Sequence, residues 1–173
     1  MIVTGYQTLE DQENADYIEQ YGPFVCKRPD AWLGDGYYFW DSNIDWAHDW
    51  GDYYSQNGYV ICSSQIRLDE TVFDLFGNVK HQQLFERAYI ALRERTRSEV
   101  TVPQVINAMK MLKAFPFHAI RAFDEPRTVS TIRYNHKRPE QLIIGQRVQI
   151  CLVNKNNLLS QTFRIVFPEK YVI

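Results

Sequence analysis

Alternating hydrophobic and polar residues, together with runs of β-branched residues, predict six strands along the chain. Each is short and is bounded by glycine, asparagine, proline or charged residues. They are IVTGY (2–6), GYYFW (36–40), YVICSSQIRL (59–68), FHAIRAF (117–123), RVQICLV (147–153) and TFRIVF (162–167). The polar stretches HKRPEQ (136–141) and NKNN (154–157) predict turns.

Hydrophobic residues three or four positions apart predict helices in the intervening segments. The first is expected over residues 8–22, with Thr8 as its cap, Asp11 as the acid of a capping box and Gly22 at its end. The second is expected to begin at Ser42, with Asp45 three residues later, and to run to about Gln56 before Gly58.

A helical insertion is predicted at about residues 78–114. Leu84, Ala88 and Leu92 form an apolar stripe over 78–97, and arginines 87, 93, 95 and 97 make its polar side basic. A further helix follows Thr101 and Gln104, which form a capping box, with Pro103 in its first turn and Val105, Met109 and Leu112 inward. The order of elements predicts an α+β fold with split, mainly antiparallel sheets.

Length and composition indicate one globular domain over residues 1–173, since 45% of the residues are hydrophobic and 23% are charged. No apolar run has the roughly 20 residues of a membrane helix, and the N-terminus lacks a basic and apolar signal pattern. Cys26, Cys62 and Cys151 lie far apart and form no metal-binding or disulfide pattern. We therefore expect buried free thiols, a cytoplasmic protein and no membrane partner.

Charge is distributed unevenly along the chain. Residues 1–60 hold eleven acidic and two basic residues, whereas residues 61–173 hold ten acidic and seventeen basic residues. One interpretation is an acidic face and a basic face, the latter attractive to phosphates or a polyanion. The other is that the two halves interleave in the fold and neutralise each other.

Common catalytic motifs are absent from the sequence: there is no P-loop, HExxH, GxSxG or CxxC, and the four histidines lack metal-ligand spacing. The stretch WLGDGYYFWD (32–41) combines glycines with aromatic residues. These residues predict either the wall of a ligand slot or a core strand beside a cluster of tryptophans.

The segment GDGYYFWDSNIDWAHDW (34–50) resembles the GxGxYFa…SxANY segment of ADP-ribosyltransferases of the PARP and diphtheria-toxin type. Gly34 and Gly36 take the glycine positions, Tyr38 takes the position of the tyrosine that stacks on nicotinamide, and Ala47 takes that of the alanine. Trp46 stands where that family has an amide-binding serine. The second stacking tyrosine corresponds to Asp49, so Trp46 or Trp50 is the candidate second wall.

Both ends of the chain follow the same order of elements. In TGYQTL, Gln7 stands where the family has a ribose-binding histidine, and in VQICLV, Gln149 stands where it has a catalytic glutamate. The resemblance thus implies a Gln7–Tyr38–Gln149 variant of the His–Tyr–Glu triad. It spans the first strand, the central strand and helix, and the last hairpin.

The resemblance implies an enzyme of bacterial or phage, toxin-like type that binds NAD in a cleft between two small sheets. It would transfer ADP-ribose to a macromolecular acceptor, either protein or nucleic acid, and release nicotinamide. The implied catalytic residues are Tyr38, Gln149 and Gln7, and the implied NAD-binding residues are Gln7, Thr8, Gly36, Tyr38, Trp46 and Trp50. The basic helix 78–97 is expected to face the acceptor or the pyrophosphate.

Loss of the glutamate limits this interpretation. An amide keeps a hydrogen bond to the ribose 2′-hydroxyl but loses the charge that stabilises an oxocarbenium-like transition state, at a cost of about 1–2 kcal/mol. In that family the loss accompanies mono-transfer or inactive domains. A non-catalytic module that binds a nucleotide or a protein on the same fold, and a structural domain whose aromatics are all core, are the alternatives.

Overall fold

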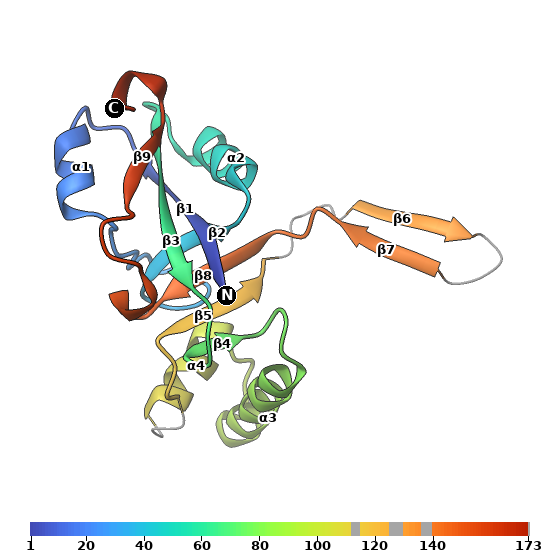
Figure 1. Cartoon of the computed structure of the whole chain (residues 1–173). Helices are drawn as coiled ribbons and strands as arrows, with labels where there is room; N and C mark the ends of the chain where they lie inside the picture. The colour runs from blue at the N-terminus through green and yellow to red at the C-terminus, as the bar shows by residue number, and fades with distance from the viewer. Residues whose placement is uncertain (112–114, 125–129, 136–139, 173) are drawn as a thin grey trace.

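The computed structural model describes residues 1–111, 115–124, 130–135 and 140–172. Seven strands form one sheet in the order β4-β5-β8-β2-β1-β3-β9 (Figure 1). Among these strands, β4 and β5 pair in parallel and every other neighbouring pair is antiparallel. The mixed fold and the mainly antiparallel sheet therefore confirm the coarse prediction. The strands are β1 (Ile2–Glu10), β2 (Tyr37–Asp41), β3 (Tyr59–Arg67), β4 (Val72–Asp74), β5 (Ala119–Phe123), β8 (Val148–Leu152) and β9 (Arg164–Phe167).

A separate hairpin of β6 (Ser130–Asn135) and β7 (Glu140–Ile144) extends away from this sheet (Figure 1). The six strands expected from alternation are all present, whereas β4, β6 and β7 were not predicted. β4 has only three residues, too few for an alternating pattern. The turn expected at 136–141 falls largely on residues outside those described, and NKNN forms a 3-10 turn, η1 (Lys155–Asn157).

Two short helices cover opposite faces of β1 and β3. Ile18 of α1 (Ala15–Tyr21) packs with Val60 and Cys62, whereas Ala47 of α2 (Ile44–Tyr54) packs with Trp40 and Ile61. Consecutive residues of a strand point to opposite faces, so α1 and α2 lie on the two sides of the sheet. Figure 1 shows them on either side of β3.

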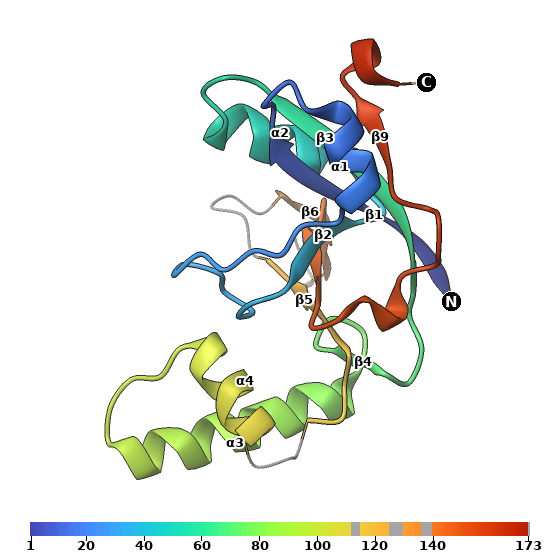
Figure 2. The same cartoon turned by 90° about the vertical axis from the view of Figure 1, so that its left-hand side faces the viewer.

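The helical insertion packs at the other end of the sheet (Figure 2). It consists of α3 (Val79–Thr96) and α4 (Val102–Met111). Val105 and Met109 of α4 are buried as expected, together with Phe73 of β4 and Ile120 of β5. The reciprocal bonds of the Thr101–Gln104 capping box are present, while Leu112 lies outside the described residues.

Two predicted helix starts are wrong. Thr8 continues β1, where it pairs with Ile61 of β3, so α1 begins only at Ala15 although it ends before Gly22 as expected. Pairing with a neighbouring strand outweighs the local capping pattern there. In α2 the cap is Asn43, whose Oδ1 accepts from the Asp45 amide, while Ser42 has a left-handed φ of 58°.

Cys62 and Cys151 are buried free thiols, and Cys26 is half-buried and also unpaired. Over the described residues, no helix has the length and apolar character needed to cross a membrane.

Candidate functional site

A cleft of about 550 Å³ opens where β1 and β2 stop pairing. The two strands are matched only at Gly5 with Asp41 and at Tyr6 with Trp40. Beyond these pairs, residues of β1 after Tyr6 and Tyr38 of β2 line the cleft. Its other walls come from Asp124, Arg147 and Gln149, from α2, and from the loop between α1 and β2, which Figure 2 shows running out between α2 and α4.

Aromatic side chains make up much of the cleft wall. They come from four parts of the chain: β1, the loop before β2, β2 itself and α2. Such rings present flat apolar surfaces on which a planar ligand ring can stack. The aromatic residues of the wall are Tyr6, Phe24, Trp32, Tyr38, Trp40, Trp50 and Tyr54, whereas the Phe39 ring packs in the core with Ile66 and Ile150.

Tyr38 and Gln149 share one face of the sheet. Tyr38 pairs with Cys151, and Trp40 pairs with Gln149, so the side chains of these residues point the same way. The strands of Tyr38 and Gln149, β2 and β8, are therefore neighbours in the sheet. Gln149 is buried, and its Oε1 accepts a hydrogen bond of 2.7 Å from Nε1 of Trp32.

Tyr38 lines the cleft, but its hydroxyl is bonded to the backbone and is not available as a base. Its hydroxyl donates to the Gly34 carbonyl at 2.8 Å and accepts from the Leu33 amide at 2.9 Å. Burial, with a smaller contribution from Cys151, raises the pKa of Tyr38 well above its usual value. The phenol therefore stays neutral, and its two bonds fix the GDG turn against β2.

Gln7 closes its amide onto the backbone of Phe24. Nε2 donates to the Phe24 carbonyl and Oε1 accepts from the Phe24 amide, both at 2.9 Å. A longer bond of 3.4 Å joins Nε2 to the Tyr38 carbonyl. Gln7 lines the cleft, but these bonds make it a clamp that holds the loop beside β1. Its assignment as a ribose-binding group stays a prediction.

The remaining expected NAD-binding residues divide into two pairs. Thr8 and Trp50 line the cleft, and Thr8 Oγ1 also donates to the Ala47 carbonyl at 2.8 Å. Gly36 and Trp46 are not among its lining residues. Gly36 lies directly against the Cys151 sulfur, where a Cβ would collide, and Trp46 packs into the cluster around Ala47.

Charged residues that the sequence analysis missed also line the cleft. Arg147 Nη2 pairs with Asp124 at 2.8 Å, and its guanidinium stacks over Trp40 at 5.3 Å. Arg28 pairs with Asp30 at 3.2 Å and stacks over Trp50 at 5.2 Å. The sequence does contain an indication that Arg28 has a special role, because Arg28 and its neighbour Lys27 are the only basic residues of the first sixty.

Asp124 is the more enclosed of the two cleft carboxylates. Burial raises its pKa, although the neighbouring Arg147 opposes that shift. Both carboxylates have an arginine partner, and positions 7 and 149 carry neutral amides. Among the residues that the structure describes, no group of three His, Cys, Asp or Glu could hold a metal ion. The site is thus equipped to bind a planar ring and an anionic group.

Comparison with protein-family models, with curated proteins and with solved structures gave no match to this chain. The similarity to ADP-ribosyltransferases therefore stays a prediction from the sequence motif. Function has to be inferred from the cleft itself.

Proposed function

We propose that the cleft binds NAD and that the protein transfers ADP-ribose from NAD to a macromolecular acceptor. One observation carries the proposal: Gln7, Tyr38 and Gln149, which are far apart in the sequence, come from three neighbouring strands and line a single aromatic cleft. That arrangement is what the resemblance to an ADP-ribosyltransferase-like split fold implies for the three residues.

The cleft offers suitable chemistry for the two halves of this reaction. Its aromatic walls can stack the nicotinamide ring. Cleavage of the nicotinamide–ribose bond develops positive charge on the ribose, as in glycoside cleavage. The Gln149 amide can hydrogen-bond a ribose hydroxyl, so it orients the sugar but supplies only a partial negative charge. We therefore expect slow transfer.

A second candidate function is non-catalytic nucleotide binding. It is favoured by the absence of a charge at positions 7 and 149 and by the internal bonds that both amide oxygens already accept. In this case NAD binds but no nicotinamide is released.

Titration with NAD tests the shared requirement of both functions. Trp32, Trp40 and Trp50 line the cleft, so bound NAD should quench tryptophan fluorescence. Trp50→Phe should reduce the quenching and weaken binding, whereas Trp46→Phe, outside the cleft lining, is the matched control. Absence of any binding at millimolar NAD would contradict both functions.

Detection of the products then separates the two functions. A transferase releases nicotinamide and leaves an ADP-ribose mass increment on an acceptor after incubation with NAD and cell lysate. Binding of NAD without either product supports the non-catalytic module.

A further inference from the structure

Arg147 has a buried donor with no hydrogen-bond partner among the residues that the structure describes. Its Nε atom is buried and makes no hydrogen bond within the described residues, although Nη2 is paired with Asp124. A buried donor of a charged group is costly to leave unbonded, and such a group in a native fold calls for an explanation. Nε itself is closed to solvent, but the Arg147 side chain as a whole is 24% exposed, so an anionic oxygen can bind at the part of the guanidinium that faces the cleft.

A second guanidinium, that of Arg28, lies over a neighbouring indole ring in the same cleft. Arg147 stacks on Trp40, Arg28 stacks on Trp50, and the two indole rings lie 5.9 Å apart. Each guanidinium lies within cation–π distance of its indole and keeps N–H groups beyond the one bonded to Asp30 or Asp124, and such groups suit phosphate oxygens. Two guanidinium groups in one cleft can serve two phosphates.

The distribution of charge along the chain also supports an anion-binding site in this cleft. Residues 1–60 carry eleven acidic residues, yet their two basic residues, Lys27 and Arg28, both line this cleft. With Arg147 they give three cations against the carboxylates Asp30 and Asp124. An otherwise acidic segment thus places its positive charge where a ligand would enter.

We infer that Arg28 and Arg147 form a pyrophosphate-binding site, so that the cleft takes nucleotides with two linked phosphates. The inference rests on the cleft being the ligand site of the proposed function, and it assigns the phosphate end of that ligand. The lining aromatic residues over which no guanidinium lies, such as Trp32 and Tyr38, are left for the planar ring.

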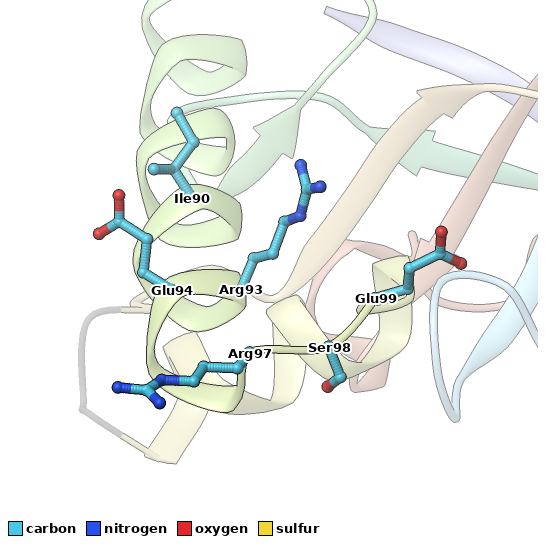
Figure 3. A pocket seen from close by; sticks show the side chains of 6 residues that line it. All are labelled: Ile90, Arg93, Glu94, Arg97, Ser98 and Glu99. Atoms are coloured by element: carbon cyan, nitrogen blue, oxygen red, sulfur yellow. The ribbon is translucent and has the colours of Figure 1, made fainter.

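A hollow on α3 provides a matched control. It is lined by two arginines and two glutamates, Arg93, Arg97, Glu94 and Glu99, together with Ile90 and Ser98 (Figure 3). The side chains of Arg93 and Arg97 point away from each other there. Arg93 is exposed, so its replacement removes one positive charge without touching the cleft.

The test measures calorimetric binding of inorganic pyrophosphate and, separately, of nicotinamide. Arg147→Gln and Arg28→Gln should each weaken pyrophosphate binding about tenfold or more, since each removes a charge-assisted bond. Arg147→Lys keeps the charge but loses the planar fork, so its affinity should fall between those of the wild type and Arg147→Gln. Arg93→Gln should leave the affinity within about twofold, because long-range charge effects are screened.

Loss of Arg147 also leaves Asp124 unpaired, so folding must be checked by thermal melting. The double variant Asp124→Asn/Arg147→Gln removes that unpaired charge, and the half-exposed Arg28 provides an independent variant. Equal pyrophosphate affinity in the wild type and in the folded Arg28 and Arg147 variants would overturn the inference, as would an equal loss in Arg93→Gln. Nicotinamide binding without pyrophosphate binding would overturn this inference and leave the proposed function standing. Arginine-dependent pyrophosphate binding without NAD or nicotinamide binding would support it and reject the proposed function.

Discussion

Gln149 occupies a position that accepts either an amide or a carboxylate. Its Oε1 accepts from Trp32 Nε1, a bond that a glutamate oxygen can also accept. Gln149→Glu adds a full negative charge where positive charge develops in the proposed reaction. We expect NAD glycohydrolysis to rise about tenfold or more, in kcat more than in KM, because the charge acts on the transition state. Nicotinamide release at saturating NAD measures the effect.

The same buried environment supplies the control for that variant. Burial raises the pKa of an introduced carboxyl group, so the gain should increase with pH as the group ionises. Gln149→Ala should lower any activity that the wild type has. A folded Gln149→Glu protein that binds NAD but hydrolyses it no faster at any pH would show that position 149 does not face the reacting ribose.

At the scale of elements, the start of α2 separates two candidate caps. Asn43 provides the side-chain bond to the Asp45 amide, whereas the Ser42 hydroxyl donates to Asp41 outside the helix. Asn43→Ala should therefore lower the free energy of unfolding by about 1 kcal/mol, and Ser42→Ala by less than about 0.5 kcal/mol. Urea unfolding of both variants measures the difference. A larger loss of unfolding free energy for Ser42→Ala than for Asn43→Ala would show that Ser42 caps α2, as the sequence pattern predicts.

Local pattern predicted the elements better than it predicted their ends or the cleft. Alternation in 36–40 and 147–153 predicted two strands, and both are present as β2 and β8. The end of β1 depends on pairing with residues 59–61, which no local pattern shows. Arg28 and Arg147 were missed for a related reason: their position depends on tryptophans supplied by other elements.

At the scale of the whole molecule, Asp11 ties the first strand to the C-terminal turn. It accepts bonds from the Glu13 amide and the Tyr171 hydroxyl, and it pairs with Lys170 at 3.1 Å. Burial opposes the shift, but these bonds lower the pKa of Asp11 below its ordinary value of 3.8. The folded state therefore binds fewer protons than the unfolded state in that range, so this stabilisation is present above pH 3.8 and is lost as the pH falls through the lowered value.

Asp11→Asn removes this proton-linked stabilisation. We expect a lower melting temperature than in the wild type at pH 7, and convergence of the two as the pH falls below 3.8. Melting curves between neutral and acid pH measure both quantities. A constant difference at every pH would mean that the Asp11 carboxylate contributes through packing alone.

NAD should stabilise the whole chain, because a ligand that binds only the folded state raises its free energy of unfolding. At one hundred times its dissociation constant the gain is about 2.7 kcal/mol, which corresponds to about 5–10 °C in melting temperature for a chain of this size. If the protein binds NAD without catalysis, this increase in melting temperature persists during incubation with NAD.

Under the transferase function, and without an acceptor, water takes the ADP-ribosyl group and gives free ADP-ribose and nicotinamide, so the increase in melting temperature changes with time. ADP-ribose keeps both phosphates, so a smaller increase should remain, and it should be smaller still in Arg147→Gln. Differential scanning fluorimetry before and after long incubation, with nicotinamide assayed in parallel, distinguishes the two courses. No increase with millimolar NAD in the wild type would contradict NAD binding itself, because no folded-state ligand can bind without raising stability.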